Sequence, residues 1–105
     1  MSYSNAAVTS AGDNPTHVEK ILLINDELGL HARPAAKIAQ AAQQFVSRIT
    51  LHYDEVTVDA KSILDILTLA AGRGACLVLR CEGLDADSAA SELTALLTEY
   101  ASMEE

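Results

Sequence analysis

The segment GLHARPAA, residues 29–36, marks the start of a helix that carries a histidine at its entrance. Gly29 is typical of a turn, and Pro34 suits the first helical turn because its missing N–H group would have no partner there. His31 stands just before the helix, and Arg33 follows two residues later. The imidazole, the guanidinium and the free backbone N–H groups of the helix start therefore surround one point. An anion bound there, such as a phosphoryl group on the histidine, would be stabilised.

The hydrophobic pattern predicts strands and helices on both sides of this segment. We expect strands over residues 18–24, 48–53, 56–58 and 76–81, and helices over about 32–44, 62–71 and 86–100, the last of them capped by Asp85. The order βαββαβα predicts an α+β open-faced β-sandwich, in which a four-stranded antiparallel sheet carries three helices packed on one face. Because the chain has no Trp, one Phe and three Tyr, its core should be aliphatic.

The length and composition indicate one folded domain. Of the 105 residues, we expect residues 1–16, which are polar and lack apolar periodicity, to form a disordered tail, and residues 17–105 to form the domain. The net charge of -8 and the pI near 4.6 argue against nucleic acid or an anionic membrane as a partner, since both attract basic proteins. We expect such an acidic small protein to be a monomer.

The cysteines and the lack of targeting segments indicate the cytoplasm. Cys76 and Cys81 lie on one predicted strand with an odd spacing, so they should point to opposite faces and cannot form a disulfide. No apolar run is long enough to span a membrane, and the N-terminus lacks the features of a signal peptide. No group of Cys and His has the spacing of metal ligands, so we expect neither a metal nor a cofactor.

Ser62 begins the second predicted helix. Ser62 and Asp65 fit the S-x-x-D pattern of a capping box, in which the serine side chain accepts a hydrogen bond from the helix start. The same hydroxyl group is a candidate phosphorylation site, where a phosphate would add about two negative charges to the surface.

The second predicted helix has more apolar residues than one buried stripe needs. Ile66 and Leu69 suffice to face the core. Ile63, Leu64 and Leu67 then stay at least partly exposed and form a candidate docking patch for another protein. The alternative is a helix that is buried on all sides, and we favour the exposed patch.

The other candidate positions are expected to be structural. Gly72-Arg73-Gly74 has some likeness to a phosphate-binding loop, but it is typical of the turn that ends a helix. His17 lies beside the tail and His52 on a strand, and both are expected to be structural or solvated.

Two motifs inside this order of elements resemble one family. Gly29–Ala35 (GLHARPA) and Ala60–Ile63 (AKSI) resemble HPr, the histidine-containing phosphocarrier of the bacterial phosphoenolpyruvate-dependent sugar phosphotransferase system. The likeness extends from about Val18 to Tyr100. It implies that the chain carries a phosphoryl group stoichiometrically and is not an enzyme.

The resemblance also implies roles for individual residues. His31 would accept the phosphoryl group on Nδ1 from enzyme I and pass it to a sugar-specific enzyme IIA, while Arg33 steadies the phosphate. Ser62 would be the target of an ATP-dependent HPr kinase/phosphorylase that slows transfer through His31. The docking surface for these partners would include one cation and the apolar patch, namely Lys37, Ile63, Leu64 and Leu67.

Two other functions stay open. A regulatory module that has kept the fold would bind an enzyme or transcription factor through Ser62 and the apolar patch, although the presence of His31 favours the carrier. A carrier of a nitrogen-related branch is suggested by three exposed positions where family members often have basic residues, namely Gln40, Gln43 and Asp65. The intact segment 61–63 favours the sugar branch instead.

Overall fold

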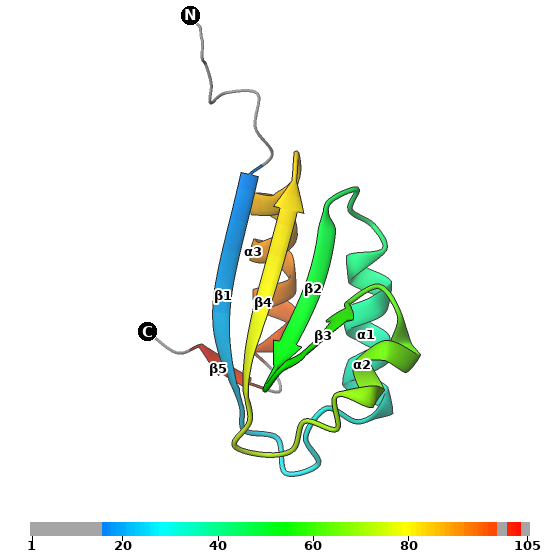
Figure 1. Ribbon diagram of the computed structural model, residues 1–105, viewed down its shortest axis with the longest axis vertical. Helices are drawn as coiled ribbons and strands as arrows, with labels where there is room; N and C mark the ends of the chain where they lie inside the picture. Colours follow the sequence, from blue (N-terminus) through cyan, green and yellow to red (C-terminus); the bar gives the residue numbers. More distant parts are fainter. Residues whose placement is uncertain (1–15, 99–100, 104–105) are drawn as a thin grey trace, which may run out of the picture.

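The computed structural model describes residues 16–98 and 101–103 and confirms the open-faced α+β architecture. The elements follow in the order β1 (Thr16–Ile24), α1 (Ala32–Ala42), β2 (Arg48–Tyr53), β3 (Val56–Asp59), α2 (Ile63–Thr68), β4 (Cys76–Gly83), α3 (Ala86–Leu97) and β5 (Ala101–Met103). The helices lie on one side of the sheet, and its other face is uncovered (Figure 1). None of the helices in the described ranges has the length and hydropathy needed to cross a membrane.

The sheet is antiparallel throughout, with the strand order β3-β2-β4-β1-β5. Its first four members are the predicted strands. The fifth, β5, is short and was not predicted; it pairs with the end of β1, where Leu22 lies opposite Met103. β1 also begins at Thr16, two residues before the predicted start. The predicted tail before it and Tyr100 lie outside the described residues.

The core between the sheet and the helices is aliphatic, as predicted. Alternate residues of the central strands face the helices because side chains of a strand point to opposite sides. The largest buried aliphatic side chains are Leu22, Ile24, Ile38, Ile49, Leu51, Ile66, Leu77, Leu79, Leu93 and Leu97. Cys76 is exposed and Cys81 buried, and both are free thiols, which confirms their placement on opposite faces.

The second helix is shorter than predicted. α2 ends at Thr68, whereas the pattern predicted a helix to about residue 71. Ala70 has a φ of 51°, in the left-handed region, which stops the helix before the predicted glycine turn. The buried side chains of Leu69 and Ala71 still pack into the core, and their apolar character made the helix seem longer.

The prediction that the Asp85 side chain caps α3 is wrong. Asp85 occupies the N-cap position but makes no side-chain hydrogen bond to the helix. Its carboxylate instead accepts hydrogen bonds from the amides of Val46 and Ser47, at 3.0 and 2.9 Å, and from the Ser47 hydroxyl. These bonds hold the pKa of Asp85 below its usual value, and the bond from the Ser47 hydroxyl contributes most. Asp85 thereby joins the start of α3 to the segment before β2.

Candidate functional site

His31 lies at the N-cap of α1, as predicted. Its backbone is extended, with φ −94° and ψ −169°, and its carbonyl oxygen accepts a hydrogen bond from Ala35 N at 3.0 Å. The His31 side chain makes no capping bond and is 29% exposed. The imidazole is therefore accessible to a partner while its backbone is held by the helix.

The first turn of α1 offers unpaired donors beside this histidine. The amides of Ala32 and Arg33 lie in the first turn, where no carbonyl group of the helix is in reach to accept from them. Neither amide donates to another described group. Pro34 follows and is buried. Because proline has no N–H group, it adds no unpaired donor. The first turn contains no acidic residue. The positive end of the helix dipole is thus open to an incoming anion.

Arg33 and Lys37 are exposed cations on the same helix. Within residues 16–98 and 101–103, neither side chain forms a hydrogen bond or an ion pair. A guanidinium without an internal partner can bind phosphate oxygens with two parallel donors. The predicted positions of Arg33 and Lys37 on the wet face of α1 are confirmed.

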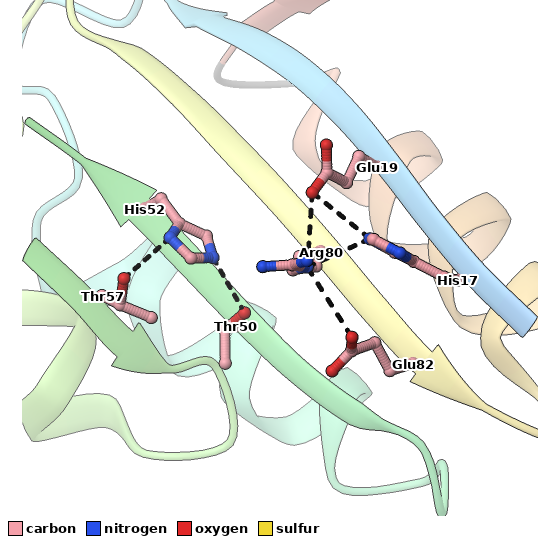
Figure 2. Close-up of polar contacts among 7 residues, drawn as sticks. All are labelled: His17, Glu19, Thr50, His52, Thr57, Arg80 and Glu82. Atoms are coloured by element: carbon pink, nitrogen blue, oxygen red, sulfur yellow. Dashed lines mark hydrogen bonds and ion pairs between the residues drawn. The ribbon is translucent and has the colours of Figure 1, made fainter. Parts of the chain in front are cut away.

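The other two histidines lie on the uncovered face of the sheet, and their rings contact other side chains (Figure 2). His52 lies between Thr57 Oγ1, 2.7 Å from Nδ1, and Thr50 Oγ1, 3.2 Å from Nε2. His17 Nε2 accepts a hydrogen bond from Arg80 Nε at 3.0 Å and lies 3.3 Å from Glu19 Oε2. Their predicted structural roles fit these contacts, and neither ring lies at a helix start.

Arg80 shows how a cation of this chain is neutralised elsewhere. Its Nε atom lies 3.3 Å from Glu19 Oε2 and 3.8 Å from Glu82 Oε2, so two carboxylates flank one guanidinium (Figure 2). Arg33 has no such carboxylate among the described residues. The Arg33 guanidinium is therefore available to an external anion at the start of α1.

Asp26 is a residue of the site that the sequence analysis missed. Its Oδ2 atom lies 3.9 Å from Nε2 of His31. Its Oδ1 atom accepts a hydrogen bond from Leu28 N at 2.9 Å, and its carbonyl oxygen accepts one from Gly29 N at 2.9 Å. Aspartate is typical of such a turn, so the sequence signals the turn itself. The approach of the second carboxylate oxygen to His31 has no local sequence signal.

The loop after α2 supports the loop that carries His31. Leu30 N, next to His31, donates to Ala71 O at 2.9 Å. At the end of β1, Ile24 N donates to Ala75 O at 2.9 Å, and Ile24 O accepts from Gly74 N at 2.8 Å. Residues 73 and 74 form a turn in this second loop. The prediction that residues 72–74 end the helix is wrong, because α2 already ends at Thr68. The position of His31 thus depends on backbone contacts between two loops.

Ser62 lies at the N-cap of α2, and its predicted capping bond is present. Ser62 Oγ accepts a hydrogen bond from Asp65 N at 3.2 Å. The preceding residue, Lys61, donates through Nζ to Phe45 O at 2.8 Å, and its carbonyl oxygen accepts from Gln43 Nε2 at 2.8 Å. The start of α2 is therefore attached to the end of α1, a helix about 16 Å long with His31 at its other end.

The apolar residues of α2 divide as predicted. Ile66 is completely buried, whereas Ile63 is 38% and Leu64 75% exposed. Leu67 is half-buried against the core. Ile63, Leu64 and Leu67, the α2 patch, therefore leave apolar surface open beside Ser62. Leu28, 73% exposed in the loop before His31, adds apolar surface that the sequence analysis did not single out.

No group of three or more His, Cys, Asp and Glu side chains in the described ranges could hold a metal ion. The site therefore consists of one imidazole, one carboxylate, one guanidinium and the amides of a helix start. Such a set can accept and hold a phosphoryl group on a ring nitrogen, because the nucleophile and the donors for the phosphate oxygens lie at one helix terminus.

Comparison with known proteins points to the same chemistry. A family model described as "PTS HPr component phosphorylation site" matches residues 18–99. The chain is 44% identical over 79 residues to the phosphocarrier protein HPr of Treponema pallidum, and this match covers 75% of this chain and 90% of that protein. It is 43% identical over 74 residues to the phosphocarrier protein HPr of Cupriavidus necator, covering 70% and 83%. The crystal structure of HPr from Bacillus anthracis superposes with a TM-score of 0.71 at 40% identity, covering 77% of this chain and 96% of that one.

Proposed function

Because the chain belongs to the HPr family of phosphocarrier proteins, we propose that it relays a phosphoryl group from phospho-enzyme I to an enzyme IIA through Nδ1 of His31. The observation that carries this proposal is an accessible imidazole at the N-cap of α1, next to amides that no other described group uses. The group rests on the protein itself between two partners, so the protein acts as a carrier and not as a catalyst.

The residues around His31 have separate tasks in this relay. The amides of Ala32 and Arg33 donate to the phosphoryl oxygens, and the Arg33 guanidinium neutralises part of their charge. Both enzyme I and enzyme IIA dock over the exposed sides of α1 and α2, where Lys37 supplies a cation and the α2 patch supplies apolar surface.

Ser62 is proposed as a regulatory phosphorylation site for an HPr kinase/phosphorylase. Ser62 is a half-buried residue at the start of α2, beside the exposed Ile63 and Leu64. A phosphate there adds about two negative charges to the docking surface and repels acidic partners. Labelling by the kinase and ATP should be lost in Ser62→Ala and kept in Ser88→Ala, a control serine exposed on α3. Equal labelling of Ser62→Ala and the unmodified protein would exclude Ser62 as the target.

We place the protein in the sugar branch because the segment Lys61-Ser62-Ile63 is intact. Transfer from the phosphorylated protein to purified enzyme IIA proteins of both branches measures this assignment directly. Faster transfer to a nitrogen-related enzyme IIA than to every sugar-specific one would assign the protein to the other branch.

The carrier function is tested by incubation with enzyme I and phosphoenolpyruvate. The unmodified protein should gain one acid-labile phosphoryl group, and a sugar-specific enzyme IIA should remove it. His31→Ala should gain none. His52→Ala is the matched control, because this imidazole is held by Thr50 and Thr57 on the uncovered sheet face, and it should be labelled normally. Labelling that persists in His31→Ala would contradict the proposal.

A further inference from the structure

We propose that Asp26 is a positioning residue for the phosphoryl transfer, because its carboxylate favours the His31 tautomer that keeps the proton on Nε2 and exposes the lone pair of Nδ1. This inference rests on the proposed function of His31. It concerns a residue that does not touch the phosphoryl group and acts only through the ring.

The backbone fixes the direction of the Asp26 carboxylate. Oδ1 is held by Leu28 N at 2.9 Å, and the Asp26 carbonyl oxygen is held by Gly29 N at 2.9 Å. Oδ2 is then directed to Nε2 of His31 at 3.9 Å. The two side chains are 25% and 29% exposed, so solvent screens their interaction less than it would on an open surface.

The separation of 3.9 Å is longer than a hydrogen bond, so the interaction is electrostatic. A carboxylate on the Nε2 side of an imidazole stabilises a proton on Nε2 relative to one on Nδ1. A neutral ring with Nε2–H has its free electron pair on Nδ1. The nucleophile is therefore the ring nitrogen that does not face Asp26.

The charges of the transfer step explain why a carboxylate helps further. The Nδ1 electron pair forms a bond to phosphorus, the bond from phosphorus to the donor atom breaks, and its electron pair leaves with the donor. Nε2–H is retained, so the phosphorylated ring carries one positive charge. Asp26 offsets this charge as it develops. In the onward step the acceptor attacks phosphorus, the electron pair returns to Nδ1, and the same neutral tautomer is restored.

Glu27 provides a matched control for this role. It follows Asp26 in the same loop and is exposed, and it contacts no other described residue through an ion pair. Asp26→Asn keeps an oxygen for Leu28 N, removes the charge and replaces the oxygen that faces Nε2 with an amide NH2 donor. Glu27→Gln removes the same charge from the neighbouring position without altering the environment of Nε2.

The test measures the tautomer of His31 and the transfer rate in the same three proteins. Nitrogen-15 chemical shifts of the ring should report Nε2–H as the main neutral tautomer in the unmodified protein and in Glu27→Gln, with a shift towards Nδ1–H in Asp26→Asn. Single-turnover transfer from phospho-enzyme I should slow about five- to tenfold in Asp26→Asn and less than about twofold in Glu27→Gln.

Two outcomes would overturn the role of Asp26. One is an unchanged tautomer ratio and rate in Asp26→Asn, and the other is an equal loss of rate in both variants, which would assign the effect to net charge alone. Both are distinguishable from failure of the carrier function, in which the unmodified protein itself gains no phosphoryl group on His31.

Discussion

A β-carbon added to Gly29 would lie 2.4 Å from the carbonyl oxygen of Ala71, closer than any ordinary contact. The backbone of the His31 loop therefore touches the backbone of the loop that follows α2. Gly29 also has a φ of +67°, which side-chain-bearing residues rarely adopt. Both constraints act two residues before His31, so the glycine is needed for the imidazole to stand at the helix start.

Gly29→Ala should lower the free energy of unfolding by about 2 kcal/mol or more, from the positive φ and the contact with Ala71 together. It should also slow phosphorylation of His31, because the loop must move. Gly72→Ala is the control, since a β-carbon there meets nothing within 4 Å. Urea denaturation should show Gly72→Ala within about 0.5 kcal/mol of the unmodified protein. Equal stability of the two variants would show that the loops do not constrain each other.

Leu64→Asp should weaken docking without unfolding the protein, because the Leu64 side chain is 75% exposed in the α2 patch. We expect KM for enzyme I to rise about tenfold with kcat little changed. The matched control is Leu84→Asp, because Leu84 is 86% exposed in the turn between β4 and α3, at the end of the molecule away from the His31 loop (Figure 1). A similar rise of KM in both variants would remove the case for a patch on α2.

Asp85 should make stability dependent on pH in the acidic range. Its pKa is lowered in the folded state by the Ser47 hydroxyl and the Val46 amide, so the charged form favours folding. This contribution is complete above the unfolded pKa of about 3.9 and is lost as the pH falls through the lower folded pKa. Asp85→Asn should therefore be less stable than the unmodified protein at neutral pH, with a smaller difference near pH 3. Asp87→Asn removes an exposed charge from the same helix start. Its difference in stability from the unmodified protein should not become smaller near pH 3.

The two cysteines should differ in reactivity. Cys76 is exposed, whereas burial, with the nearby charge of Asp85, raises the pKa of Cys81 to about 11. A thiol reagent at about pH 8 should therefore modify Cys76 rapidly in the folded protein and Cys81 only on unfolding. Cys76→Ser should abolish the fast reaction. A fast reaction that persists in Cys76→Ser would mean that β4 opens readily.

Local patterns predicted most of the fold because short-range physics decides it. The alternation in 48–53 matches β2, and the proline at position 34 located the start of α1. The excess of apolar residues on the second helix identified which of its side chains are exposed. The core was predictable as an aliphatic layer because it follows from side-chain alternation and helical spacing.

The features that could not be predicted depend on contacts through space. β5 pairs with β1 across most of the chain, and three residues alone carry no strand signal. Asp85 has the composition of a cap, but its carboxylate bonds Ser47, 38 residues away. The same holds for Asp26, whose turn was predictable while the direction of Oδ2 was not. The position of His31 was predictable because its helix start is encoded next to it.

Attachment of phosphorus to Nδ1 of His31 is the central claim, and nitrogen–phosphorus coupling tests it most directly. The protein is labelled with nitrogen-15 at histidine, phosphorylated by enzyme I and phosphoenolpyruvate, and examined by NMR. We predict a one-bond coupling between phosphorus and Nδ1 of His31, with the proton retained on Nε2. Coupling to Nε2, to His17 or to His52, or a phosphoryl group on no histidine, would contradict it.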